Sequence, residues 1–310
     1  MAYTNQRMAY GNTLVELGKD NERIVVLDAD LGGSTMGKLF EAAFPKRHFE
    51  MGIAEANMTS VAAGLAQTGK IPFTNSFAVF AAGRAYDQIR QSIATGKLNV
   101  KICGSSSGLS DFGDGATHQA VEDMAIMRAM PNMTVICPAD ANETVQAVKA
   151  IVKMDGPCYL RLNRNDYENV TAEDRPFEIG MPNVLKDGDE IAVFATGVMV
   201  GKSLEAAKEV KDRISVKVIN VSTIKPMNTE AILEMVKGCK AVVTVEEHNI
   251  VGGLGSAIAE VLSKECKPIE FVGVNDTFGS SAHNYEDVLN YYGLTKENIV
   301  KAIEKMAAKY

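Results

Sequence analysis

One carboxylate in the chain, Glu55, stands where a strand-like segment gives way to a strongly apolar helix. Residues 50–55 read EMGIAE, and residues 59–66 are small or apolar. This order predicts an acid in the first turn of a helix that packs into the interior, a placement that suits a buried cofactor site. The alternative from the local sequence is an ordinary first-turn acid that complements the helix dipole.

A second candidate for chemistry is the segment at residues 104–119, which is rich in glycine and serine. It carries Asp111, Asp114 and His118 among its small residues. Loops of this length without helix or strand are usually functional or disordered. A flexible surface loop is the alternative, but the position between an apolar strand and a helix favours a site.

These segments need a scaffold, and the sequence predicts a parallel sheet. Short runs rich in Val and Ile alternate with amphipathic stretches through most of the chain. Strands are expected at 23–27, 71–74, 100–104, 133–137 and 158–162, and helices at 5–17, 54–66, 83–93, 118–127 and 142–154. Repeated alternation of strand and helix is typical of an α/β fold with a mostly parallel sheet flanked by helices.

The alternation is interrupted once and then resumes. Residues 163–189 are rich in Asn, Asp, Pro and Gly, which is typical of a connection between domains. Beyond them, strands are expected at 191–195, 215–220, 241–245 and 270–274, and helices at 201–210, 229–236, 255–264 and 297–308. We therefore predict two successive α/β domains, at residues 1–165 and 189–310, with a linker at 166–188.

Four notable segments follow successive strands of the first domain, at residues 28–34, 52–55, 75–80 and 104–118. The carboxyl ends of parallel strands meet at one edge of the sheet, and ligands bind beyond that edge. We expect the four segments to converge there, and this convergence is a stronger argument than any single motif.

Composition excludes several classes of function. The 310 residues carry a net charge of -7, which argues against general affinity for nucleic acid. The sequence shows neither a signal peptide nor a membrane-spanning run, so we expect no membrane association and a cytoplasmic location. Five scattered cysteines and four histidines lack disulfide or metal-ligand spacing, which predicts free thiols and no protein metal centre.

Several segments occur in the order in which transketolases carry them. These segments are residues 28–31, 52–55, 77–88, 114–119 and 245–255, and the match covers nearly the whole chain. The chain resembles the C-terminal half of a transketolase, the pyrimidine-binding domain followed by the C-terminal domain, as found in split, two-subunit forms. The resemblance implies a transferase of pentose phosphate metabolism that moves a two-carbon ketol unit from a ketose to an aldose.

The resemblance also implies thiamine diphosphate as the cofactor. Glu55 would contact its aminopyrimidine ring and share a proton with a ring nitrogen, which activates the cofactor. Phe77 and Phe80 match the aromatic residues beside that ring, and Asp30 matches an acid near the cofactor at the subunit interface. Apart from the resemblance, core packing explains the two phenylalanines and a strand-end turn explains Asp30. Phe73 falls one position away from a third aromatic residue of the family.

On the substrate side, the resemblance implies that Arg7, Ser34 and Arg164 hold the sugar phosphate. Arginine binds phosphate in a fork of charge-assisted hydrogen bonds. His118 and Asp114 match residues that contact the hydroxyl groups of the ketose. Without the family match, the arginines are surface charges, the histidine starts a helix and the aspartate caps a turn.

Ser106 departs from the family pattern, because transketolases usually have a histidine there that binds phosphate or sugar. Phe112 and Gly113 also replace the usual Gly-Glu pair before the aspartate. A hydroxyl can bond an anion but adds no positive charge. We therefore expect a changed range of donor or acceptor sugars.

The half of the cofactor site that holds the diphosphate and its Mg²⁺ or Ca²⁺ has no counterpart in this sequence. Residues 113–115 resemble the start of that motif, but Asn132 follows too early to complete it. The resemblance therefore implies an N-terminal partner subunit that holds the diphosphate and metal, in an α2β2 complex, with self-association through the second domain also possible. Two alternatives stay open: the β subunit of a 2-oxo acid dehydrogenase E1 component, and a non-catalytic assembly subunit.

Overall fold

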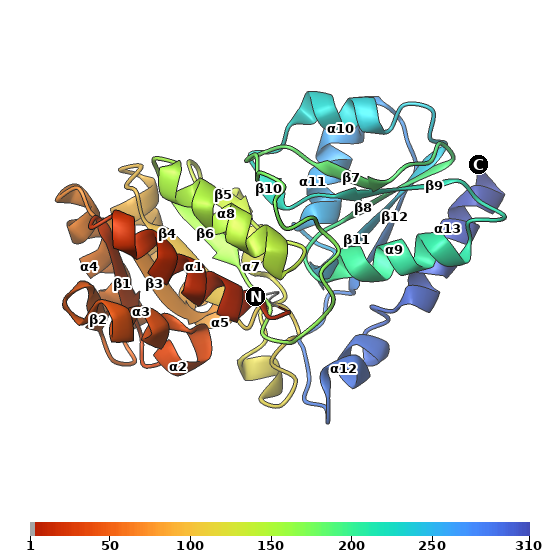
Figure 1. Ribbon diagram of the computed structural model, residues 1–310. Helices are drawn as coiled ribbons and strands as arrows, with labels where there is room; N and C mark the ends of the chain where they lie inside the picture. The colour runs from red at the N-terminus through yellow and green to blue at the C-terminus, as the bar shows by residue number, and fades with distance from the viewer. Residues whose placement is uncertain (1–3) are drawn as a thin grey trace.

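Two sheets organise the chain. The computed structural model describes residues 4–310, and its two sheets form the two lobes seen in Figure 1. The first sheet has seven strands in the order β10-β5-β6-β4-β3-β1-β2. Their bounds are β1 Ile24–Asp28, β2 His48–Glu50, β3 Ile71–Phe77, β4 Lys101–Ser105, β5 Thr134–Ile136, β6 Cys158–Arg161 and β10 Thr223–Lys225. All neighbouring pairs are parallel except β10 with β5.

The second sheet has five strands in the order β12-β11-β8-β9-β7. Their bounds are β7 Asn183–Lys186, β8 Ile191–Ala195, β9 Val216–Asn220, β11 Ala241–Asn249 and β12 Ile269–Val274. Only β7 runs antiparallel to its neighbour. The predicted fold class, two domains with mostly parallel sheets flanked by helices, is confirmed.

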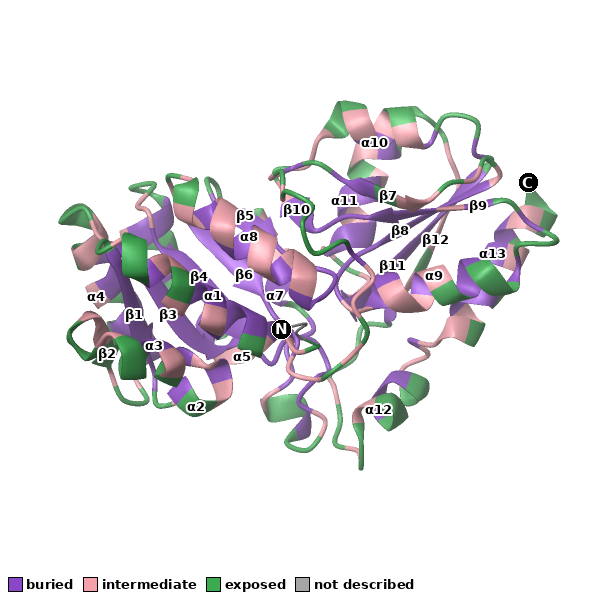
Figure 2. Cartoon of the chain, in the orientation of Figure 1, coloured by how far each residue is buried: buried purple, intermediate pink, exposed green. Residues whose placement is uncertain are grey.

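Helices flank both sheets, and the strands between them are mostly buried (Figure 2). The first lobe has α1 Gln6–Asp20, α2 Gly32–Thr35, α3 Gly37–Ala43, α4 Glu55–Gln67, α5 Ala78–Gly83, α6 Tyr86–Gln88, α7 Asp123–Ala129 and α8 Ala141–Lys153. The second has α9 Met199–Glu209, α10 Thr229–Met235, α11 Leu254–Val261, α12 Tyr285–Tyr291 and α13 Lys296–Lys309.

Two predicted helices differ from the structure. The helix expected at 83–93 begins earlier and is divided. The chain forms α5 from Ala78, directly after β3, and α5 ends at Gly83. Two short segments follow, α6 and a π-helical segment at Ile89–Ala94. The helix expected at 118–127 begins only at Asp123. The residues before it form a short 3-10 turn, Gly115–Thr117, and then an antiparallel bridge in which Ala120 N–H donates to Gly108 O at 2.9 Å.

The two lobes share strands and core. β10 comes from the second half of the sequence but completes the first sheet, and β7 lies within the segment predicted as linker but belongs to the second sheet. One apolar cluster includes Val135 of the first lobe together with Ile224, Ile232 and Leu254. This shared core means that segments at the junction are held in place from both sides.

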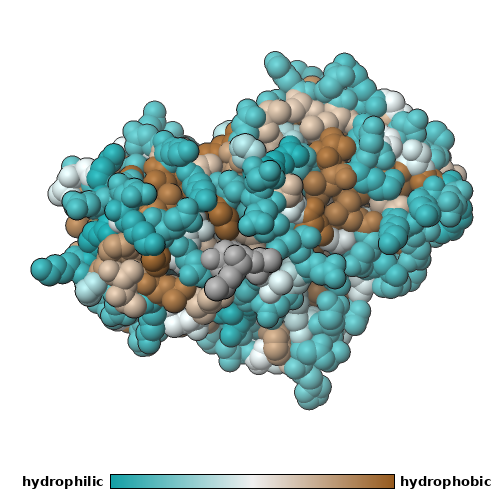
Figure 3. Space-filling model, in the orientation of Figure 1, coloured by the Kyte–Doolittle hydropathy of each residue, from teal (hydrophilic) through white to brown (hydrophobic). Residues whose placement is uncertain are grey.

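The surface is mostly polar on the face shown in Figure 3, where hydrophobic residues form separate patches. Among residues 4–310, no helix has the length and apolarity needed to cross a membrane. The five cysteines are unpaired, as predicted; four are buried and Cys266 is exposed.

Candidate functional site

Glu55 begins α4 and is buried, with 3% of its surface exposed. Gly52, three residues earlier, has φ +68°, a left-handed conformation that glycine adopts without strain. Glu55 Oε1 lies 3.5 Å from Nη1 of Arg84, whose side chain is about half exposed. The Arg84 guanidinium also lies 4.3 Å from the centre of the Phe80 ring. The acid therefore sits inside the protein under a cation that reaches the surface.

Three predicted site residues form an aromatic group beside this acid. Phe77 ends β3 and Phe80 lies in α5; their ring centres are 6.1 Å apart and the planes differ by 17°. His118, from the loop after β4, meets both rings edge-on at 6.1 and 5.3 Å. Residues predicted to contact cofactor and sugar thus lie in contact with one another.

The two predicted phosphate-binding arginines lie at the same edge. The Arg164 guanidinium is 6.0 Å from the Phe77 ring centre, and its Nη1 is 2.5 Å from Asp111 Oδ2. Arg7 Nη1 donates to the backbone oxygen of Ser34 at 2.9 Å, so Ser34 meets Arg7 through its carbonyl group. Asp111 is a residue that the sequence argument left without a role.

The environment of Arg7 suits an anion. Burial lowers the pKa of its guanidinium, the nearby charge of Arg164 lowers it further, and Asp166 and Asp111 oppose both effects. Its Nε is buried without a hydrogen-bond partner in the structure. A buried N–H without an acceptor is costly, and a phosphate between two guanidiniums would satisfy it.

The other predicted residues are placed differently. Asp30 and Asp114 are exposed. Asp30 has φ +58°, and its N–H donates to Glu50 Oε1 at 2.8 Å, an oxygen that also accepts from Gly52 N–H at 2.9 Å. The turn at Asp30 is therefore tied to the segment that leads to Glu55.

Ser106 is fully buried with φ +50°, and its Oγ has no hydrogen-bond partner. Three more buried polar atoms at the ends of β3 and β4 also lack partners: Asn75 Nδ2, Ser76 Oγ and Ser105 Oγ. Buried polar groups are nearly always paired, so each of these atoms keeps a hydrogen bond available for a further partner. The sequence offered a signal for them, since each follows an apolar run at a strand end.

These residues suit one end of the cofactor that the resemblance implies. A buried carboxylate and two nearly parallel aromatic rings suit a planar heterocycle that carries a proton-accepting nitrogen. The diphosphate end of that cofactor is different, because it is held together with a metal ion. Within residues 4–310, no three His, Cys, Asp or Glu side chains are grouped so that they could hold a metal ion.

Buried charges also occupy the junction of the lobes. Arg161 and Asp123 form an ion pair with Nε–Oδ2 at 2.8 Å, and the Tyr159 hydroxyl donates to the same oxygen at 2.8 Å. Burial raises the pKa of both the Glu246 and the Glu247 carboxyl to about 7. These acids lie in the motif at 245–255, which sequence reasoning assigned to no chemistry.

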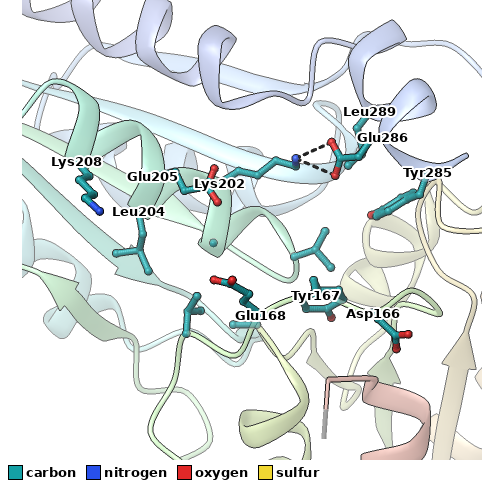
Figure 4. Close-up of a pocket in the computed structure, with 14 residues that line it drawn as sticks. Asp166, Tyr167, Glu168, Lys202, Leu204, Glu205, Lys208, Tyr285, Glu286 and Leu289 are labelled. Atoms are coloured by element: carbon teal, nitrogen blue, oxygen red, sulfur yellow. Dashed lines mark hydrogen bonds and ion pairs between the residues drawn. The ribbon is translucent and has the colours of Figure 1, made fainter.

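A separate cavity of about 360 Å³ lies between α9, α12 and the segment after Arg164 (Figure 4). Its rim carries charges of both signs, and Lys202 Nζ donates to both carboxylate oxygens of Glu286, at 3.2 and 3.0 Å. None of the ten predicted site residues lines it. Tyr285 forms part of its wall, and the hydroxyl of this tyrosine is bonded to Glu247.

Two family descriptions match the chain, one for each lobe. The transketolase pyrimidine-binding domain matches residues 3–169, and the transketolase C-terminal domain matches residues 180–299. Both matches agree with the order of the two sheets along the sequence.

Two relatives and one solved structure match the chain over almost their entire length. The chain is 46% identical over 308 residues to a Methanocaldococcus jannaschii protein provisionally named a transketolase C-terminal section, with 97% of this chain and 96% of that protein covered. It is 41% identical over 305 residues to a 6-deoxy-6-sulfo-D-fructose transketolase subunit of Clostridium sp. strain MSTE9, covering 98% and 94%. A solved structure described as a split-gene transketolase, inactive beta4 tetramer, has a TM-score of 0.90 and 47% identity, covering 99% of each chain.

Proposed function

The chain belongs to the transketolase family as a C-terminal subunit of the split type, and on that premise we propose that it transfers a two-carbon ketol unit between sugar phosphates. The observation that supports this proposal best is the grouping at one sheet edge: Glu55 buried under Arg84, with Phe80, Phe77 and His118 in mutual contact.

In this proposal, Glu55, Phe77 and Phe80 hold the pyrimidine ring of thiamine diphosphate, the cofactor that the family implies. When bound, this cofactor supplies the electron sink that cleavage of a carbon-carbon bond next to a carbonyl requires. The Glu55 carboxyl holds a proton at a ring nitrogen, and the aromatic residues orient the ring and exclude water. Asp30, which is exposed on a turn tied to the Glu55 segment, would lie towards the partner subunit.

Arg7 and Arg164 would bind the phosphate of the sugar, with Asp111 orienting Arg164. Ser34 positions Arg7 through its backbone oxygen. His118 and Asp114 would contact the sugar hydroxyls from the loop after β4. The relative from Clostridium is named for a sulfonated sugar, so membership of the family does not fix the donor sugar. A substrate screen has to identify the donor of this chain.

A partner subunit completes the proposal. It would hold the diphosphate and the Mg²⁺ or Ca²⁺, in an α2β2 complex, and the second domain could mediate self-association. The β subunit of a 2-oxo acid dehydrogenase E1 component is the alternative enzyme, but the arginine pair and residues 114–119 favour ketol transfer between sugars. Retention of Glu55 in a buried site argues against a purely structural subunit.

The deciding experiment is reconstitution. We expect the chain mixed with a candidate N-terminal subunit, thiamine diphosphate and Mg²⁺ to convert a ketose phosphate and an aldose phosphate, with turnover at least about a hundredfold above either subunit alone. A coupled assay over a panel of ketose donors measures it, with 2-oxo acids as the panel for the E1 alternative. Calorimetric titration adds a second readout, since tight cofactor binding by this chain alone would contradict the need for a partner.

Ser106 gives a test of sugar range within the same complex. We expect Ser106→His to raise kcat/KM for ordinary pentose phosphates by about tenfold relative to the native donor, because a histidine can add a charge-assisted hydrogen bond. Ser106→Ala is the control, since it removes the hydroxyl group without adding a charge or a new hydrogen-bond donor. Equal activity of wild type and Ser106→His on pentose phosphates, with no better donor in the screen, would contradict an altered range.

A further inference from the structure

Glu247 belongs to the second lobe, near the end of β11, yet its buried carboxylate holds two segments of the first lobe. Its Oε1 accepts hydrogen bonds from Leu109 N–H at 2.9 Å and from the Tyr285 hydroxyl at 2.8 Å. Its Oε2 accepts from Asn163 Nδ2 at 3.2 Å. Gly108 has φ +61°, and a Cβ at that position would lie 2.5 Å from Glu247 Cδ. The loop therefore packs directly against the carboxylate, without room for a side chain.

Both segments lead to the candidate phosphate site. Leu109 lies two residues before Asp111, and Asn163 lies directly before Arg164, the partner of that aspartate at 2.5 Å. Asn163 N–H also donates to Gln6 Oε1 at 2.7 Å, and Gln6 directly precedes Arg7. One carboxylate thus contacts a residue one or two positions before each member of the Arg164–Asp111 pair, and it is linked to Arg7 through two residues, Asn163 and Gln6.

The adjacent acid, Glu246, has a different role. It is equally buried, but its two oxygens accept from the N–H groups of Leu254 and Gly255 at 2.7 and 2.8 Å, at the start of α11. Neither contact belongs to a segment of the site. Glu246 stabilises its own lobe, whereas Glu247 acts across the junction.

We propose that Glu247 is a positioning residue for the phosphate end of the substrate: it sets the placement of Arg164 and Asp111 relative to Arg7 without touching the sugar. This inference rests on the proposed function, because it assigns the second lobe a part in substrate specificity at the same site. A small anion that carries two negative charges, such as a phosphate monoester, is the ligand that this arrangement favours.

The test replaces Glu247 by Gln, which keeps the size of the side chain. One amide oxygen can still accept from Leu109 and Tyr285, but the amide nitrogen then faces Asn163 Nδ2, donor against donor. In the reconstituted complex we expect KM for a ketose phosphate to rise about tenfold, while KM for the same sugar without phosphate changes less than about twofold. In the isolated chain, the affinity for inorganic phosphate should fall about tenfold, as measured by NMR titration of labelled arginine side chains.

Two further variants separate positioning from general stability. Glu246→Gln is the matched control, because it replaces an equally buried acid at the adjacent position. It should leave unchanged the ratio of KM for the ketose phosphate to KM for the sugar without phosphate. The pair Glu247→Gln with Asn163→Asp reverses donor and acceptor across the contact, and it should restore most of the phosphate affinity. Arg164→Met gives the reference for complete loss of the anion site.

The outcomes are distinct. A KM ratio within twofold of wild type in Glu247→Gln, an equal change in Glu246→Gln, or no Arg164-dependent phosphate binding by the wild-type chain would overturn the positioning role. If instead phosphate binding falls in Glu247→Gln and recovers in the reversed pair, while the complex turns over no ketose phosphate, the positioning role stands and the proposed reaction fails.

Discussion

Replacing Glu55 by Gln should reduce turnover of the reconstituted complex by about 10²- to 10⁴-fold, the usual range for loss of a proton-transferring group. The glutamine side chain has nearly the same shape as glutamate and can still accept a hydrogen bond. It cannot hold a titrating proton at a ring nitrogen. Glu55 is only 3% exposed, so little water reaches this position. A water molecule therefore does not take over the proton transfer in the variant.

The measurement is steady-state kinetics at saturating cofactor, with assembly checked by sedimentation. The control is Glu297→Gln, which removes another acid from the first turn of a helix, α13, but at an exposed position far along the chain. That variant tests the ordinary helix-dipole interpretation and should change turnover less than about twofold. Turnover of Glu55→Gln within threefold of wild type, in an intact complex, would exclude the proton role.

Asp123→Ala should lower the free energy of unfolding by about 3–5 kcal/mol, because it leaves a buried cation without its partner. Arg161 and Asp123 are 3% and 1% exposed in their side chains, and the Tyr159 hydroxyl loses its acceptor as well. Arg161 also donates from Nη2 to the backbone oxygens of Ala120 and Glu247, at 3.2 and 2.9 Å. Disturbing this guanidinium therefore affects the contact between the lobes as well as the first lobe.

Urea unfolding of the isolated chain measures this effect. Glu304→Ala is the matched control, since it breaks the pair with Arg213, in which both side chains are exposed. Exposed pairs contribute about 0–1 kcal/mol, so the control should be nearly neutral. A loss below about 1 kcal/mol in Asp123→Ala would show that the buried guanidinium is compensated by its carbonyl acceptors alone.

Local patterns were sufficient for most of the scaffold. The strand runs at 23–27 and 191–195 and the helices at 54–66 and 142–154 appear close to their expected positions, because apolar periodicity and strand length depend on neighbouring residues. The parallel sheets follow from the alternation of strand and helix. The rule that ligands gather at carboxyl edges then indicated where Phe77, Phe80 and His118 would meet.

Predictions were wrong where distant residues control the backbone. The helix expected at 118–127 begins only at Asp123. Ala120 pairs instead with Gly108, which lies on the other side of the loop after β4. β10 joins the first sheet although its sequence lies in the second block, since pairing with β5 depends on the approach of two lobes. No periodicity in a short segment carries that information.

The site residues also fall into two groups, those found from the sequence and those found only in the structure. The sequence singled out Glu55 by its place at the start of an apolar helix, and the resemblance to transketolases added the two phenylalanines and the two arginines, because the order of such residues along the chain is visible without a structure. The importance of Asp111, Arg84 and Glu247 became visible only in three dimensions. Each acts through a contact with a residue far away in sequence, 29 positions for Arg84 with Glu55 and 138 for Glu247 with Leu109. Contacts across such separations arise from the packing of whole lobes, which a linear pattern does not encode.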